Sequence, residues 1–404
     1  MTHNRRNRFY LLTACALAIL VTASCATQPR QLPANALPFK EAISIATDNL
    51  IGQTQQLPAF IAKIEAKLNK RVIVIDPLIE KASGQQTALT QQAEQRIVDD
   101  IRSKYPQFEI LPFQATNIDK AQYVLTGIFE RSNEASAQKQ FRIILALTEI
   151  KGGKVLAQTS VLARDDNLDW NPTAYYRDSP VLIRDKVVDG YIRTTEAAPG
   201  SPADRTYMER VATSTLINEA TIAYNGERIP EALGLYKTAL KSPGGEQLRV
   251  LNGLYLTNWK LGRVSEAEQS FSRIVASGLA NNSLGIKFLF NLGSTEFWSD
   301  TKISGPYKVW LRQIARQAAT AKVCMNIVGH TSRTGSEQFN EQLSQSRAAG
   351  IKQKLEVEAP ELRTRTKALG KGFHENIVGT GSDDARDALD RRVEFKIVDC
   401  AQSS

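Results

Sequence analysis

Short apolar runs alternate with helically periodic stretches through residues 40–205. The apolar runs end at turn residues and predict strands over 71–77, which Pro77 ends, and over 108–112, 121–129, 141–147 and 154–162. The periodic stretches predict helices over 39–68, with a break near Pro58, and over 88–104. Strands that alternate with helices are typical of an α/β sandwich, which we expect here. Residues 165–205, rich in Asp, Pro, Tyr and Arg, predict an irregular surface segment.

Helical periodicity dominates residues 206–282, and one pattern occurs twice. Glu231 and Tyr236 recur 35 positions later as Glu266 and Phe271. A period near 34, with small residues at the helix crossings, resembles tetratricopeptide-type (TPR-like) all-α hairpins. The alternative is a plain helical domain without a peptide groove. Because two hairpins leave an apolar face uncovered, we expect them to pack against a flanking domain or a partner.

Residues 283–404 return to the alternation of strands and helices, which predicts a second α/β sandwich. The predicted order is a strand and loop over 286–297, a helix over 307–321, a strand over 323–328, a helix from Ser336, and strands near 363–369 and over 391–398. In the last strand, alternation puts Arg391 on the apolar side with Val393 and Arg392 on the polar side.

A loop of small and hydroxyl residues joins the strand over 323–328 to the helix that Ser336 caps. Phe339, Leu343, Ile351 and Leu355 follow in that helix at spacings of four or eight, and Arg347 falls in the same row. A guanidinium on a core-facing row is costly unless something pairs it. We therefore predict a crevice with hydroxyl groups on one wall and a fixed cation on the other, which suits a carboxylate ligand.

The order of these motifs resembles the peptidoglycan-binding domain of the OmpA C-terminal family. The matching positions are Gly329-His330-Thr331, Gly335, Asn340, Leu343-Ser344, Arg347-Ala348 and Arg391-Arg392-Val393-Glu394. The resemblance implies that the partner is the diaminopimelate of a peptidoglycan stem peptide, with its carboxylate on Arg347. It implies that the peptidoglycan-binding residues are Thr331, Ser332, Asn340, Leu343, Ser344, Arg347 and Arg391.

Two positions depart from the family pattern. Ser332 stands where the family has an Asp that binds the ligand amine, and Asp390 replaces an Asn. Ser332 offers an ammonium group no charge, so we expect weaker binding or a different preferred stem peptide. Our hypothesis is that Asp383, Asp384 or Asp390 supplies the missing charge. Arg391 is a candidate second anchor, and an ion pair with Asp390 or Glu394 is the alternative.

The first 24 residues predict a signal peptide. Three arginines precede an apolar run over 9–21, which is too short to span a bilayer permanently. The run ends in Thr22-Ala23-Ser24-Cys25, which resembles a bacterial lipobox, and this implies lipidation of Cys25. Ala26 after the cysteine implies sorting to the outer membrane, on its periplasmic face. The alternative is an ordinary cleavage site with an incidental cysteine. Residues 25–39, which contain three prolines, predict an extended tether.

Cysteine usage predicts one disulfide. Cys15 leaves with the signal peptide and Cys25 is expected to be lipidated, so Cys324 and Cys400 remain as an even pair. One begins a predicted strand and the other ends one, so antiparallel neighbours would bring them together. In an oxidising periplasm we expect a bridge. Two separate buried thiols are the alternative.

Composition and motifs favour binding over catalysis. The formal net charge of +9 falls to about +6 once the three signal-peptide arginines are removed, and the basic residues are scattered, so we expect no nucleic-acid partner. Only three histidines occur, and none lies in a pattern with metal-ligand spacing. No nucleophile elbow or phosphate loop is present. We therefore predict a protein that is not an enzyme and has no cofactor and no metal.

These observations predict an α/β multidomain lipoprotein. The expected divisions are 1–24 signal peptide, 25–39 tether, 40–205 α/β domain, 206–282 hairpins and 283–404 wall-binding domain. The phrase Tyr123-Val124-Leu125-Thr126-Gly127 loosely resembles periplasmic domains of penicillin-binding-protein activators and CsgG-like proteins. The first functional hypothesis is a tether between outer membrane and cell wall. The second is a regulator or scaffold of a wall-synthesis or secretion machine, with a protein partner bound through 40–282.

Overall fold

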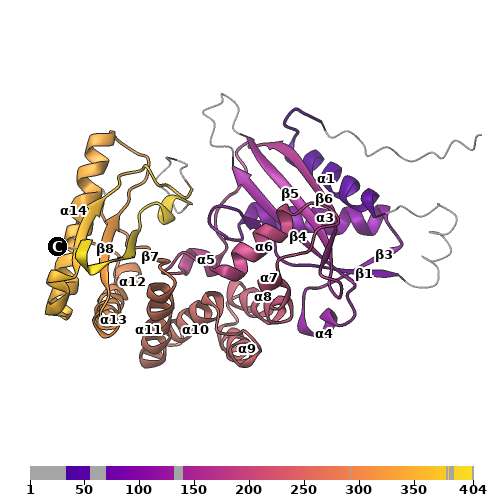
Figure 1. The fold of residues 1–404 in the computed structure, drawn as a ribbon. Helices are drawn as coiled ribbons and strands as arrows, with labels where there is room; N and C mark the ends of the chain where they lie inside the picture. Colours follow the sequence, from indigo (N-terminus) through magenta and orange to yellow (C-terminus); the bar gives the residue numbers. More distant parts are fainter. Residues whose placement is uncertain are drawn as a thin grey trace, which may run out of the picture. The chain divides into compact units, whose positions relative to one another are not determined.

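The computed structural model describes residues 33–54, 70–131, 140–291, 293–378, 381 and 386–402. They contain two mixed sheets joined by helices (Figure 1), which confirms the expected mixture of helix and sheet. The predicted signal peptide, Cys25, residues 55–68 of the first predicted helix, and Asp383 with Asp384 lie outside the described residues. None of the helices in the described part of the chain is long and apolar enough to span a membrane.

The first sheet has the strand order β3-β1-β4-β5-β6, with β2 beside β4. Its strands are β1 (Arg71–Ile75), β2 (Ile79–Glu80), β3 (Phe108–Leu111), β4 (Tyr123–Arg131), β5 (Gln140–Glu149) and β6 (Lys154–Arg164). β3, β1, β2 and β4 are parallel, while β5 is antiparallel to both β4 and β6. This part of the chain matches the strands predicted from its apolar runs to within two residues at each end.

The first sheet is buried on both faces, which explains why β1 is an unbroken apolar run. Ile73 and Ile75 pack into one core with α1 (Phe39–Gln53) and α3 (Ala88–Lys104). Val74 packs into the opposite core, where Val188 and Tyr191 approach from α6 (Lys186–Glu196). Ahead of α1, Leu37 bonds to the edge of β6, so the chain is fixed to the sheet there.

The segment 165–205 is not the irregular surface segment that its composition predicted. It contains α5 (Ala174–Asp178) and α6, and Trp170, Tyr175 and Tyr191 are almost fully buried. Asp185 caps α6 by accepting hydrogen bonds from the amides of Val187 and Val188. The aromatic residues fill the cores on either side, so this segment joins the first sheet to the helices that follow.

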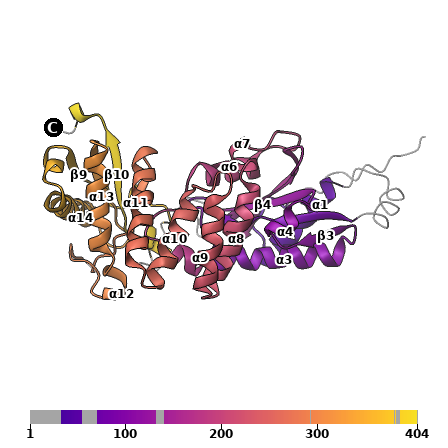
Figure 2. The same ribbon diagram turned by 90° about the horizontal axis from the view of Figure 1, so that it is seen from below.

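Helices then connect the two sheets. They are α7 (Arg205–Met208), α8 (Val211–Asn225), α9 (Ile229–Lys241), α10 (Leu248–Lys260) and α11 (Val264–Ala280), while the short α4 (Ala115–Ile118) lies between β3 and β4. Figure 2 shows α8 to α11 as successive antiparallel neighbours. The two repeat positions Tyr236 and Phe271 are fully buried at equivalent places in α9 and α11. The repeat therefore forms two helical hairpins, and α11 packs against the next helix of the chain, α13 (Tyr307–Thr320).

The second sheet has the strand order β7-β10-β8-β9. Its elements are β7 (Leu284–Ile286), α12 (Thr301–Ser304), α13, β8 (Cys324–Gly329), α14 (Glu337–Glu358), η1 (Pro360–Thr364), β9 (Thr366–Gly370), η2 (Arg386–Leu389), β10 (Val393–Val398) and η3 (Cys400–Gln402). β10 is antiparallel to β7 and β8, and β8 is parallel to β9. α13 and α14 share a core with this sheet and with the hairpins.

The predicted disulfide between Cys324 and Cys400 is confirmed. The register of β8 on β10 pairs Cys324 with Val398, which brings the start of one strand to the end of the other. The two Cα atoms are 5.0 Å apart and the sulfurs are bonded. The bridge closes the second sheet at its central pair of strands.

Candidate functional site

The candidate site lies where β8 ends and α14 begins. Ser336 caps α14 by accepting a hydrogen bond from the amide of Phe339. Gly329, the last residue of β8, lies so close to the carbonyl of Ser344 that no Cβ would fit between them. This close approach of strand and helix holds the loop over 330–335 against α14.

Arg347 is almost fully buried, and its guanidinium is held by main-chain groups. Nε donates to the carbonyl of Ser294 at 3.1 Å, and a terminal nitrogen donates to the carbonyl of Asn291 at 3.3 Å. The ring of Phe290 lies beneath the guanidinium, 4.7 Å from centroid to Cζ. The loop after β7 therefore fixes the orientation of a cation that belongs to α14.

The hydroxyl residues of the loop face the same region. Thr331 is 1% exposed, and its Oγ1 has no hydrogen-bond partner among the described residues. Its main chain is fixed by a bond from its amide to the carbonyl of Gly372. Asn340 donates from its side chain to the carbonyls of Thr334 and Ser336, which ties the loop to the first turn of α14.

These residues line a cleft of about 1120 Å³. Six of the seven predicted peptidoglycan-binding residues are in its lining: Thr331, Ser332, Asn340, Leu343, Arg347 and Arg391. The structure therefore brings them together at an opening beside Thr331. Ser344 does not line the cleft, because its hydroxyl is fully buried and bonds the carbonyl of Glu341 and the amide of Gly372. Its role is to join α14 to the segment after β9.

Two other predictions from periodicity are wrong. Phe339 does not face the core; it is 48% exposed, because in the first turn of α14 it lines the cleft instead. The expected sides of Arg391 and Arg392 are also wrong, since β10 begins only at Val393 and strand alternation does not reach them. Arg392 is the buried one, and Arg391 is half-buried and lines the cleft.

Asp390 does not supply charge to the cleft as hypothesised. Its carboxylate is fully buried and accepts hydrogen bonds from the amides of Ile377 and Val378. It therefore shapes the segment that precedes η2.

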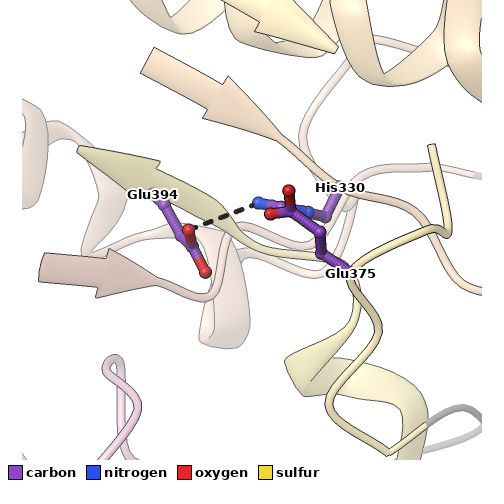
Figure 3. A group of neighbouring side chains, drawn as sticks. All are labelled: His330, Glu375 and Glu394. Atoms are coloured by element: carbon purple, nitrogen blue, oxygen red, sulfur yellow. Dashed lines mark ion pairs between the residues drawn. The ribbon is translucent and has the colours of Figure 1, made fainter. Parts of the chain in front are cut away.

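His330 is buried and lies beside two half-buried carboxylates. Figure 3 shows its imidazole facing Glu394, with Glu375 alongside. Nε2 of His330 is 3.6 Å from Oε2 of Glu394. Burial lowers the pKa of His330, against the opposing effect of Glu394. Burial would raise the pKa of Glu394, but the neighbouring His330 and the charge and hydrogen bonds of Arg392 outweigh it and hold that pKa well below its usual range. The loop is thus braced from behind by a charged group.

His330, Glu375 and Glu394 together have the side-chain chemistry of a metal site, but cations already face the two carboxylates. Arg392 donates twice to Oε1 of Glu394, at 2.7 and 2.5 Å. Lys396 lies 3.3 Å from Glu375 and 3.1 Å from Glu394. A metal would have to displace both cations, so this cluster fits an ion-pair network better than a metal centre.

The other half of the cleft was not predictable from the sequence motifs. It is lined by residues outside the 323–398 motifs, among them Tyr176, Asp178, Trp259, Lys287 and Trp298. Lys287 is buried, donates to the carbonyls of Tyr176 and Arg177, and burial lowers its pKa to about 8. β7 is attached to the segment after α5 through main-chain bonds, which is how these distant residues meet. No local pattern of the sequence signals that contact.

Comparison with known proteins gives partial similarities. No family model matches the chain. The protein named "Protein CTR9 homolog" from Arabidopsis thaliana is 23% identical over 206 residues, which is 46% of this chain; the chain spans 18% of that protein's length.

Several solved structures are similar to part of the chain. They include the peptidoglycan-associated lipoprotein from Burkholderia pseudomallei (22% identity, 28% of this chain, 89% of that chain, TM-score 0.24). The cell wall anchor of the T6SS from Pseudomonas aeruginosa is similar at 23% identity (28% and 78% of the chains, TM-score 0.23). A MotB-like protein from Desulfovibrio vulgaris is similar at 19% identity (33% and 91%, TM-score 0.25). These likenesses cover at most a third of this chain.

Proposed function

We propose that this chain binds peptidoglycan non-covalently and that the cleft beside Arg347 holds the diaminopimelate of a stem peptide. One observation carries the proposal: a guanidinium oriented by two carbonyls lines the same cleft as the buried Thr331 hydroxyl, which has no partner among the described residues. A buried hydroxyl without a partner costs about 1–3 kcal/mol. A ligand carboxylate that accepts from Thr331 and Arg347 would recover that cost.

The charges of the lining support an acidic ligand. Six cationic residues line the cleft and one acidic residue does: Arg177, Lys260, Lys287, Lys302, Arg347 and Arg391, with Asp178. A cleft rich in one sign of charge favours ligands of the opposite sign. The motif order around Thr331 and Arg347 resembles that of the OmpA C-terminal family, and this resemblance supports a stem peptide as the acidic ligand.

We also propose that lipid on Cys25 holds the protein in the outer membrane on its periplasmic face. The apolar run followed by small residues and a cysteine supports this. One acyl chain binds a membrane weakly, whereas several together anchor a protein firmly. With wall binding at the other end, the chain would attach the membrane to the wall.

The proposal is one of binding without catalysis, and labelled sacculi left undigested by the protein would agree with it. A protein partner bound through residues 40–282 stays a prediction. Mild crosslinking in cells separates the two hypotheses: recovery of one stoichiometric envelope enzyme favours a regulator, and recovery of wall material alone favours a tether.

Co-sedimentation with purified sacculi tests the proposed site. The full-length mature protein in detergent should pellet with sacculi, and a free diaminopimelate-containing tripeptide should release it. Thr331→Val keeps the side-chain shape and breaks no hydrogen bond among the described residues, so it should stay folded and lose about five- to tenfold in retention. Val357→Ala, on an 82% exposed residue outside the cleft, is the control. Equal retention of Thr331→Val and wild type would contradict the proposal.

A further inference from the structure

The cleft is larger than the end of a stem peptide requires. Ligand pockets commonly measure about 300–1000 Å³, and this one reaches about 1120 Å³. Beyond the crevice between β8 and α14, it continues along side chains from α5, α10 and α12. A ligand anchored at Arg347 therefore has room for a second, larger group in the same cleft.

Exposed apolar side chains gather around this outer part. In the described part of the chain, six large apolar side chains are exposed, and Trp298, Ile303 and Phe339 among them line the cleft. The rest, Ile222, Val264 and Val357, lie elsewhere. Clustered exposed apolar groups mark binding surfaces more reliably than scattered ones do.

Two tryptophan side chains line the outer cleft. Trp298 is 37% exposed, and its amide donates to the carbonyl of Leu289 at 2.9 Å. Trp259 is half-buried and stacks on Tyr255, with 6.2 Å between ring centroids. A tryptophan side chain has few rotatable bonds, so its ring binds apolar faces of ligands at low cost in conformational entropy.

We infer that the outer cleft binds the sugar portion of the wall fragment whose peptide carboxylate Arg347 holds, with a pyranose ring lying on Trp298. This inference rests on the proposed function. In peptidoglycan the stem peptide is joined covalently to an amino-sugar chain, so the remainder of a molecule anchored at Arg347 continues through this cleft. A pyranose ring has an apolar C–H face that suits an indole. Its hydroxyl and acetamido groups suit Lys302, a cationic donor in the lining of the cleft.

Paired binding measurements on the full-length mature protein in detergent test the inference. Calorimetry would compare a diaminopimelate-containing tripeptide with the same tripeptide carrying its disaccharide. We expect the sugar-bearing ligand to bind wild type about tenfold more tightly. Trp298→Ala should bring the ratio of the two affinities close to one, because one aromatic contact accounts for roughly three- to tenfold in affinity. Ile222→Ala, an exposed apolar residue on α8 outside the cleft, should keep the wild-type ratio.

The outcomes separate the inference from the proposed function. If wild type binds both ligands equally, or Trp298→Ala keeps the ratio, the inference is wrong while peptide binding still supports the proposed function. If neither ligand binds, both fail. An acidic peptide without diaminopimelate or sugar that binds as tightly as the disaccharide ligand, and loses affinity in Trp298→Ala, would identify a protein segment as the occupant and overturn the inference.

Discussion

The guanidinium of Arg347 lies over the ring of Phe290, 4.7 Å from its centroid. The two residues are far apart in the sequence, since Phe290 follows β7 and Arg347 belongs to α14. The carbonyls of Asn291 and Ser294 hold the same guanidinium. A cation oriented before its ligand arrives loses little conformational entropy on binding, which favours affinity.

The disulfide should contribute strongly to stability. Cys324 and Cys400 close a loop with a sequence separation of 76 residues, and a bridge of that span stabilises a protein by roughly 4 kcal/mol. We expect Cys400→Ser, or reduction, to lower the free energy of unfolding in urea by about that amount. Peptide mass spectrometry without reductant should show one linked pair. Free thiols on both residues would contradict the bridge.

Asp76 should make stability fall as pH rises. Burial raises its pKa to about 6, against the opposing effects of Arg249 and of the Tyr207 hydroxyl, which donates to it. A carboxyl with a raised folded-state pKa favours folding when protonated, so its contribution is complete below pH ~4 and is lost as pH rises through 6. The difference from its usual value corresponds to about 3 kcal/mol.

Urea unfolding of wild type and Asp76→Asn between pH 4 and 7 measures this effect. The variant should lose less stability than wild type across that range. Glu94, whose pKa burial raises to about 7, acts in the same direction and stays in both proteins. Two curves that remain parallel over the whole range would rule out Asp76 as the source.

A buried hydrogen bond joins α10 of the helical hairpins to α13 of the second α/β unit. Trp310 of α13 donates from Nε1 to the Tyr255 hydroxyl of α10 at 2.7 Å. Tyr255→Phe leaves a buried donor without its acceptor, so we expect a loss of about 1–3 kcal/mol in unfolding free energy. Tyr123→Phe, at a half-buried hydroxyl with no hydrogen bond among the described residues, is the control. Similar stability of the two variants would contradict this contact.

The proposed lipid anchor on Cys25 can be tested in cells. Cys25→Ser removes the residue proposed to carry lipid, so the protein should move from the membrane fraction to the soluble periplasmic fraction. Mass spectrometry of the wild-type N-terminus should show acyl chains on Cys25. A membrane-bound Cys25→Ser protein would mean that another segment attaches it.

Local patterns predicted most elements of both sheets. The strand Arg71–Ile75 is a continuous apolar run after Arg71, and the helix Ala88–Lys104 has a helical period, so both form where their own residues favour them. The segment around Tyr176 and Tyr191 was mispredicted because its helices bury aromatic residues against two separate cores. Burial of that kind depends on tertiary packing, which composition does not reveal.

The site was predictable only in part, for a similar reason. Thr331, Asn340 and Arg347 lie within 17 positions of one another, so a short sequence motif can indicate that they lie close together in the fold. Trp259 and Lys287 reach the same cleft through helix packing and the attachment of β7. Residues that meet only through such tertiary contacts have no characteristic spacing in the sequence.

The most direct test is calorimetric titration of wild type and Arg347→Lys with a diaminopimelate-containing tripeptide. Lysine keeps the positive charge but cannot donate two parallel hydrogen bonds to a carboxylate. Arg316→Lys, on an exposed residue of α13, is the matched control, and thermal unfolding would verify that both variants fold. We predict that Arg347→Lys weakens binding at least tenfold while Arg316→Lys binds like wild type. Equal affinity of wild type and a folded Arg347→Lys protein would contradict the account.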